Sequence, residues 1–310
     1  YKKVLSINSK FEKAYASIGA ILKHQDEIEK AIETYNEALK INPNYPEAHF
    51  LLGNAKKELF KHNEALDHFR DAIDLKNDYP AAFANMGDIY LSKDYVKEAL
   101  ASYQAALNLD PHSVEILCNL AKSHKLNGDL DVAIRNYEKA LKLDSERSST
   151  YSDYAMTLYD NGKKSEAFNN HNLAIKKDPK SVSALLNYGL TLDNNGETEK
   201  AIESYKKALA LKPDYELAHT NLGFVYLFKG DLERAIECRK WRWKSKEGQR
   251  KISHLELPEW DGEKPLKGKR ILALGEQGPG DVIIWAPGLK YLKKLGCRVT
   301  LQCHSKLVEI

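Results

Sequence analysis

Alanine recurs along this chain every 34 residues, and this spacing limits the fold more than any other feature. A second alanine follows seven residues later in most units, and a small residue precedes the first alanine by twelve in every unit. The three series are Ala31, Ala65, Ala99, Ala133, Ala167, Ala201 and Ala235; Ala38, Ala72, Ala106, Ala140, Ala174 and Ala208; and Gly19, Gly53, Gly87, Ala121, Ala155, Gly189 and Gly223. Three series on one period predict a repeat protein, in which similar supersecondary units stack in a row.

The spacing inside a unit predicts two helices joined by a tight turn. Within residues 80–113, Phe83 and Tyr90 fall on one face of a first helix, and Ala99 and Tyr103 on one face of a second. The remaining marks of the period are an aromatic residue four after the first alanine (Tyr35, Phe69, Tyr103, Tyr137 and Tyr205, with His171 as the exception), an inter-helix turn residue (Asp94, Gly128, Gly162, Gly196 and Gly230) and a closing proline (Pro43, Pro111, Pro179 and Pro213). A single hairpin leaves its apolar face uncovered, so the units are expected to stack into an all-α solenoid.

These residues resemble the tetratricopeptide repeat (TPR) family, which implies a right-handed superhelix of helical hairpins. The resemblance covers seven units, at residues 12–45, 46–79, 80–113, 114–147, 148–181, 182–215 and 216–249, and residues 1–11 resemble the end of an earlier unit. Because Tyr1 enters a pattern already under way, we expect the chain to be part of a longer protein. The large-residue slot near the start of each unit holds Tyr15, His49, Phe83, Leu117, Tyr151, Leu185 and His219, and never tryptophan.

A ladder of polar residues is the candidate binding site. Its members share one position of the first helix, which lines the concave face in this family: Asn85, Asn119, Asp153, Asn187 and Asn221. An asparagine amide both donates and accepts, so such a ladder suits the main chain of an extended peptide, as a similar ladder does in the O-linked N-acetylglucosamine transferases. The alternative is that asparagine is simply an ordinary polar residue on a wet helix face. The sequence leaves both interpretations open.

The composition of the chain limits the classes of partner that it is expected to bind. The 47 basic and 44 acidic residues are interleaved and give a net charge of +3, so neither nucleic acid nor an anionic membrane is the expected partner. No apolar run reaches the roughly 20 residues of a membrane span. Cys118, Cys238, Cys297 and Cys303 form no CxxC pair, which favours free thiols and a cytoplasmic location. The histidines show no metal-ligand spacing, so no metal site is expected, and oligomerisation is left open.

The pattern changes after the last unit. A linker is predicted over residues 250–269, and residues 270–310 are expected to begin an incomplete Rossmann-like domain. Strands are predicted at 271–274 and 298–303, with a glycine-rich turn at Gly275, Gly278 and Gly280 and a helix over 282–295 between them. No GxGxxG or GK[ST] accompanies these glycines, which argues against a dinucleotide site or a P-loop.

The turn Glu276-Gln277-Gly278-Pro279-Gly280-Asp281 and the sequences around Trp241 and Trp260 resemble bacterial proteins in which TPRs precede a glycosyltransferase-family-9-like domain of GT-B fold. The resemblance implies that Asp281 is a candidate general base and that the parent protein uses a nucleotide-sugar donor. This chain alone is not expected to be an enzyme or to bind a cofactor. We therefore expect a peptide-binding scaffold that recruits the acceptor of a glycosyltransferase, and the alternative is an interaction scaffold without enzymatic activity.

Three of the four tryptophans lie where the repeat pattern fails. Large aromatic side chains at such a point favour a packed junction, so Trp241, Trp243 and Trp260 are predicted to pack between the last hairpin and the strand at 271–274.

Overall fold

The computed structural model describes residues 11–244, 267–274 and 293–302. The chain divides into two compact units, Tyr1–Lys246 and Glu247–Ile310. No helix in the described ranges is long and apolar enough to cross a bilayer.

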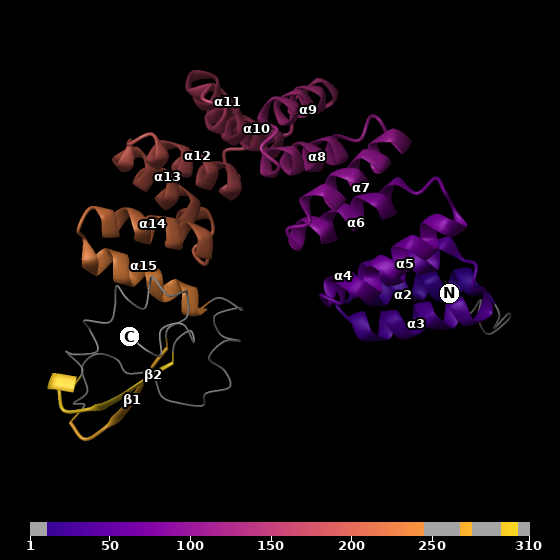
Figure 1. Ribbon diagram of the computed structural model, residues 1–310, viewed down its shortest axis with the longest axis horizontal. Coiled ribbons are helices and arrows are strands. Elements are labelled where there is room, and N and C mark those ends of the chain that lie inside the picture. The colour runs from indigo at the N-terminus through magenta and orange to yellow at the C-terminus, as the bar shows by residue number, and fades with distance from the viewer. Residues whose placement is uncertain (1–10, 245–266, 275–292, 303–310) are drawn as a thin grey trace. The chain divides into compact units, whose positions relative to one another are not determined.

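The described part of the first unit is a row of seven helical hairpins (Figure 1). The first helices are α2 (Glu12–His24), α4 (Pro46–Glu58), α6 (Pro80–Ser92), α8 (Val114–Leu126), α10 (Ser148–Asp160), α12 (Val182–Asn194) and α14 (Glu216–Phe228). The second helices are α3 (Ile28–Ile41), α5 (His62–Leu75), α7 (Val96–Leu109), α9 (Leu130–Leu143), α11 (Lys164–Lys177), α13 (Thr198–Leu211) and α15 (Leu232–Lys244). The prediction of an all-helical array is confirmed for residues 12–244.

The small residues of the repeat let the two helices of a hairpin approach each other closely. A Cβ atom added to Gly53 on α4 would lie 2.7 Å from the ring of Phe69 on α5, and one added to Gly19 would lie 2.4 Å from the ring of Tyr35. Both rings are fully buried. The paired glycine and aromatic series of the sequence therefore form the core of the hairpin, with ring against backbone.

Each inter-helix turn contains one residue in the left-handed region. This slot is filled by Asp26, Phe60, Asp94, Gly128, Gly162, Gly196 and Gly230, with φ between 58° and 88°. The amide after it donates to the carbonyl five residues earlier, as Asp129 N–H does to His124 at 2.9 Å. This Schellman arrangement ends the first helix and reverses the chain.

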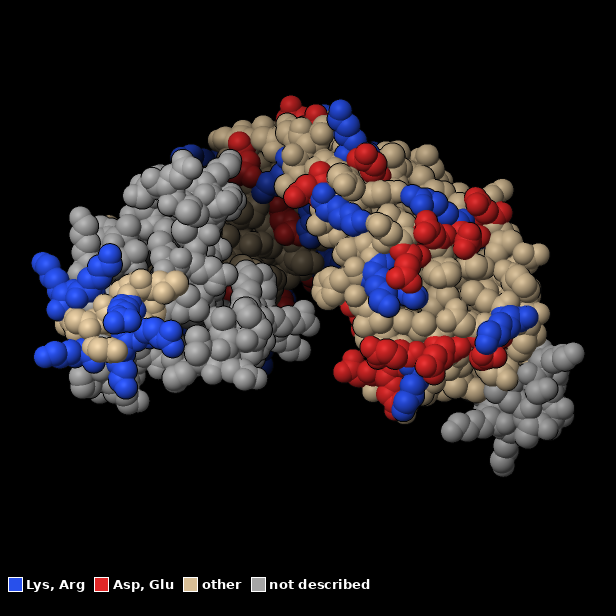
Figure 2. All heavy atoms as spheres, turned by 60° about the horizontal axis from the view of Figure 1, so that its bottom comes forward, with Lys and Arg blue, Asp and Glu red and all other residues tan. Residues whose placement is uncertain are grey.

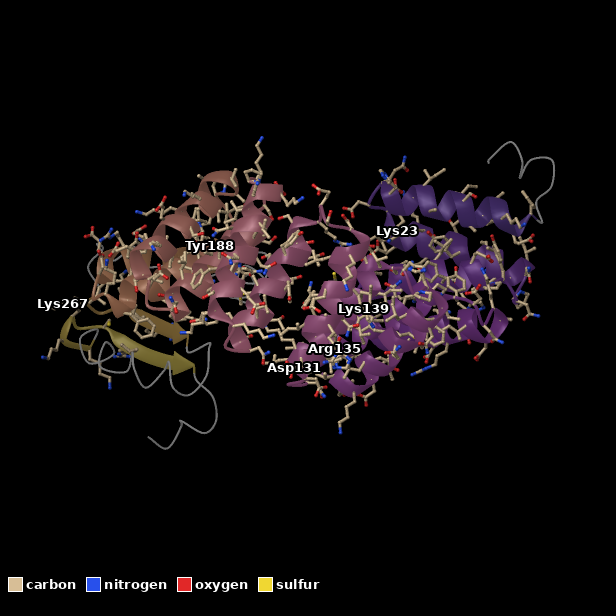
Figure 3. All side chains as sticks on the ribbon, turned by 90° about the horizontal axis from the view of Figure 1, so that it is seen from above. Lys23, Asp131, Arg135, Lys139, Tyr188 and Lys267 are labelled. Carbon is tan, nitrogen blue, oxygen red and sulfur yellow. The ribbon has the colours of Figure 1, made fainter. Side chains whose placement is uncertain are left out.

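The second helices are amphipathic. On α9, Ala133, Ile134 and Tyr137 are buried, whereas Asp131 and Arg135 are exposed, as is Lys139 one turn further on (Figure 3). The second helices contact first helices on both sides, and successive first helices also contact one another along most of the row, for example α10 with α12. The first helices thus form a surface that is continuous across hairpins.

In the second unit, β1 (Arg270–Leu274) and β2 (Arg298–Gln302) pair in parallel, with Ile271 opposite Val299. Both predicted strands are therefore present, and the last residue of the second prediction, Cys303, lies outside the described residues. Most of the predicted helix over 282–295 lies outside the described residues. Gly296, which precedes β2, has a φ of 80°.

Candidate functional site

All five residues of the predicted ladder lie on first helices and are half-buried. The residue three positions after each lies on the same side of its helix. We call these ten positions the first-helix face: Asn85, Asn119, Asp153, Asn187 and Asn221, with Asp88, Lys122, Met156, Leu190 and Phe224. The face changes in character along the chain, because its second series is charged in α6 and α8 and apolar from α10 onward.

The start of the first-helix face is a hydrogen-bonded cluster. Lys57 Nζ on α4 donates to Asn85 Oδ1 and to Asp88 Oδ2 on α6, both at 2.6 Å. The other oxygen of Asp88 accepts from Tyr103 Oη at 2.6 Å and from Asn119 Nδ2 at 3.5 Å. Burial, together with this hydrogen bond to a carboxylate, raises the pKa of Tyr103, so its hydroxyl stays a donor.

Ion pairs continue the link between neighbouring first helices. Lys122 Nζ on α8 lies 2.9 Å from Asp153 Oδ2 on α10, and Lys125 lies 2.8 Å from Asp160. The Asp153 carboxylate therefore has a basic partner within the protein.

The end of the first-helix face keeps polar groups free. Asn187 Nδ2 donates to Ser152 Oγ at 3.0 Å, and its carbonyl oxygen has no donor among the described residues. Within that same part of the chain, the Asn221 amide has no hydrogen-bond partner.

An exposed apolar stripe surrounds the Asn221 amide on α14. Leu217, Phe224 and Phe228 follow at steps of seven and four residues, which places them on the same side of the helix as Asn221. Their exposed fractions are 55%, 45% and 86%, far above those of core residues. An unpaired amide flanked by exposed apolar side chains can bind both the main chain and the side chains of a partner.

The contacts between first helices were not predicted from the sequence. Lys57–Asp88 and Lys122–Asp153 are separated by 31 residues, and Lys23–Glu58 and Lys125–Asp160 by 35. Lys23, on α2, is labelled in Figure 3. Pairs of oppositely charged residues that are 31 or 35 residues apart, close to one 34-residue repeat, are the signal in the sequence that could have revealed these contacts.

The charges on the surface of the helical unit do not favour the binding of a strongly charged ligand. Figure 2 shows acidic and basic side chains close together at many places on the helical unit, with one acidic stretch near its lower edge. Many of these charges pair within a helix, as Lys40 does with Glu37 and Lys207 with Glu203.

Several predicted residues cannot be placed. Asp281, Gly275, Gly278 and Gly280 lie outside the described residues, as does Trp260, and the side chain of Trp243 is also not described. Trp241 stacks on His219 of α14, with ring centroids 4.4 Å apart and planes 5° apart. The predicted packing of these tryptophans against the strand stays a prediction.

Models of the tetratricopeptide repeat family match most of the helical array. Those described as TPR repeat or tetratricopeptide repeat match residues 19–59, 87–128 and 194–230, residues 172–203, residues 114–147 and residues 46–79. The chain belongs to the tetratricopeptide repeat family. None of these TPR matches extends beyond residue 230, and none of the four models is a glycosyltransferase model.

Solved structures share the TPR fold at low sequence identity. PilF of Pseudomonas aeruginosa is 19% identical with a TM-score of 0.56, over 67% of this chain and 94% of its own. Yeast Tom70 is 18% identical with a TM-score of 0.60, over 82% of this chain and 56% of its own. The Cut9–Hcn1 hetero-tetramer of the APC/C is 14% identical with a TM-score of 0.62, over 72% of this chain and 44% of that one. Comparison of this TPR sequence with curated proteins gives no match.

Proposed function

We propose that this TPR array is a scaffold that binds a polypeptide segment along the first-helix face. The observation that carries the proposal is the surface of α14, where the unpaired Asn221 amide lies among the exposed side chains of Leu217, Phe224 and Phe228. Other large apolar side chains of the array are also exposed, among them Phe60 and Leu126, but on α14 three of them share one side of a helix with an unpaired amide. An apolar surface with a central polar group is typical of protein contact sites.

The partner enters in an extended conformation with apolar side chains. The free carbonyl oxygen of Asn187 and the amide of Asn221 are one repeat apart and serve as two contacts to its main chain. Each such hydrogen bond contributes only about 0.5–1.5 kcal/mol net. Most of the affinity therefore comes from burying the aromatic rings of Phe224 and Phe228, because aromatic anchors dominate such interfaces.

The polar contacts of Asn85 and Asn119 give the first part of the first-helix face a structural role. They tie α4, α6 and α8 together, so a peptide there would have to replace existing hydrogen bonds. Binding is accordingly concentrated toward α12 and α14. This modifies the ladder hypothesis, in which all five positions contribute alike.

The experiment is a peptide selection with the whole chain. Random peptides displayed on phage are selected, and one enriched peptide is labelled for fluorescence anisotropy. Phe224→Ala is expected to lower its affinity at least about 10-fold, in line with the loss of one anchor of about 1.4 kcal/mol or more. Selection of no peptide, or equal binding to Phe224→Ala, contradicts the proposal.

Recruitment of an acceptor for a glycosyltransferase is the second candidate. The parallel pairing of β1 with β2 supports the Rossmann-like start that such a domain requires, because a βαβ unit contains a parallel pair and the sequence predicts a helix between the strands. It predicts that the protein carrying this chain transfers a sugar from a nucleotide-sugar donor, and that Asp281→Asn abolishes transfer while leaving peptide binding intact. Transfer at the wild-type rate by Asp281→Asn would remove Asp281 from the chemistry.

A further inference from the structure

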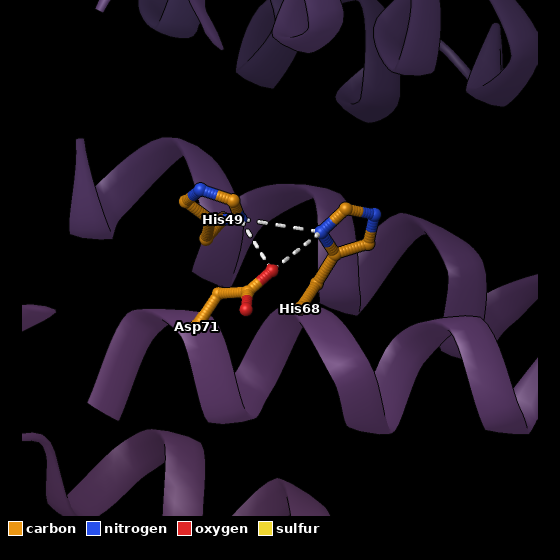
Figure 4. Close-up of side chains that lie close together, drawn as sticks. All are labelled: His49, His68 and Asp71. Carbon is orange, nitrogen blue, oxygen red and sulfur yellow. Dashed lines mark hydrogen bonds and ion pairs between the residues drawn. The ribbon is translucent and has the colours of Figure 1, made fainter. Parts of the chain in front are cut away.

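Three potential metal ligands converge within the hairpin of residues 46–79. His49 lies on α4, and His68 and Asp71 lie one turn apart on α5 (Figure 4). The two histidine Nδ1 atoms are 3.2 Å apart, and Asp71 Oδ2 lies 3.3 Å from Nδ1 of His49 and 3.8 Å from Nδ1 of His68. All three donor atoms therefore lie on the corners of one small triangle.

A hydrogen bond at the outer nitrogen of His49, Nε2, leaves the inner nitrogen, Nδ1, available to bind a metal ion. This Nε2 lies 3.0 Å from the carbonyl oxygen of Pro43, which can only accept, so Nε2 carries the hydrogen. In the neutral ring, the lone pair of His49 then lies on Nδ1, the nitrogen close to His68 and Asp71. Metal-bound histidines use their second nitrogen in this way, donating to a carbonyl or carboxylate that holds the ring in place.

The size of the triangle fits a tetrahedral ion. Ligand atoms at about 2.0–2.1 Å from Zn²⁺ lie about 3.3–3.4 Å from one another in a tetrahedron. The distances of 3.2 and 3.3 Å match this edge, and a small rotation of the exposed Asp71 side chain shortens the third. We propose that Nδ1 of His49, Nδ1 of His68 and the Asp71 carboxylate bind one divalent transition-metal ion of the Zn²⁺ class, with the fourth position open to solvent.

Burial and charge suit this ligand set. The side chains of His49 and His68 are 13% and 25% exposed, whereas that of Asp71 is 51% exposed, so an ion can enter from the Asp71 side. Two imidazoles and one carboxylate are ligands that Zn²⁺ accepts in sites with one open position.

The last hairpin provides an internal comparison. His219 occupies the same slot as His49, and its Nε2 lies 2.8 Å from the carbonyl oxygen of Pro213. The residues equivalent to His68 and Asp71 are Cys238 and Trp241, and the Trp241 ring stacks on His219. The carbonyl contact is thus a feature of the slot, and the ligand triangle belongs to the hairpin of residues 46–79.

No metal site was predicted from the sequence, because the histidines show no metal-ligand spacing. The ligands come from both helices of a hairpin, and His49 occupies a slot that usually holds a large packing residue. The pair His68 and Asp71, three residues apart on α5, was the available signal.

The experiment titrates the whole chain with Co²⁺, whose visible spectrum reports tetrahedral coordination, and with Zn²⁺ by calorimetry. One equivalent of either ion is expected to bind and to raise the melting temperature, because the folded hairpin alone assembles the site. His68→Gln and Asp71→Asn are each expected to lower Zn²⁺ affinity at least about 100-fold, since loss even of outer partners costs 10–100-fold. His219→Gln is the matched control and should bind Zn²⁺ like the wild type.

The folding of each variant is checked by circular dichroism. Two results would overturn the site: a wild-type chain that binds neither ion, and a folded His68→Gln variant that retains wild-type affinity. The first would leave His49 and His68 joined by a simple hydrogen bond, and the second would place the ion elsewhere.

Discussion

At the scale of single residues, the structure explains two departures from the repeat pattern. His171 replaces the aromatic residue of its series and is fully buried, with Nε2 2.8 Å from Thr191 Oγ1 and no partner for Nδ1. Phe60 occupies the left-handed slot of the turn, where four of the seven units have glycine. Each departure places a residue in surroundings to which it is poorly suited, so each gives a prediction.

Replacing His171 with phenylalanine is expected to remove a pH-dependent loss of stability. Burial lowers the pKa of His171 to about 4, against about 6.5 in the unfolded chain. The unfolded state therefore binds more protons as the pH falls from 6.5 to about 4, and the wild type loses stability over this window, roughly 2 kcal/mol at pH 5. Urea unfolding at pH 7 and pH 5 measures this, and the advantage of His171→Phe should grow at pH 5. An advantage that is the same at both pH values would show that His171 does not stay neutral.

Replacing Phe60 with glycine is expected to stabilise its hairpin. Phe60 has a φ of 58° and is 73% exposed, so it bears the strain of this conformation with little packing in return. The expected gain in the free energy of unfolding is about 0.5–1 kcal/mol, the left-handed penalty less the entropy that glycine loses. Asp94→Gly is the control and should gain less, because aspartate tolerates this region. Thermal unfolding would contradict this account if Phe60→Gly melted below the wild type.

At the scale of helices, the sequence specified the hairpins but not their polar contacts. The 34-residue period placed the helices because a ring packs against a small residue at the same point of successive hairpins, as Phe69 does against Gly53 and Tyr205 against Gly189. The contacts of Lys57 with Asp88 and of Lys122 with Asp153 could not be anticipated in the same way. They depend on side-chain reach between hairpins and occur in only some units.

The close approach of α4 and α5 predicts that Gly53→Leu destabilises the array. A Cβ at this position already lies 2.7 Å from a ring carbon of Phe69, and a larger side chain has to displace that buried ring. Overpacking of this kind costs about 1–3 kcal/mol. Urea unfolding measures the loss, with the half-exposed neighbour Asn54→Leu as the control. Equal stability of the two variants would show that the helices separate easily at this point.

At the scale of the whole molecule, the stacked hairpins form one continuous surface from first helices that are far apart in sequence. The sequence correctly placed the ladder on these helices, but treated its five members as equivalent. In the structure Asn85 is already hydrogen-bonded and Asp153 is ion-paired, whereas Asn221 is unpaired and lies in an apolar stripe. The difference arises from the residues one turn away, which the 34-residue period does not constrain.

The most direct test of a polypeptide-binding face compares two variants, each with four asparagines changed to alanine. One removes Asn85, Asn119, Asn187 and Asn221 from the first helices, and the other removes the exposed Asn36, Asn108, Asn169 and Asn172 from the second helices. Anisotropy of the selected peptide should show at least about 10-fold weaker binding to the first variant and unchanged binding to the second, because only the first loses main-chain contacts of about 0.5–1.5 kcal/mol each. Equal affinity of both folded variants and the wild type would contradict the account, because none of the four asparagines would then contact the peptide.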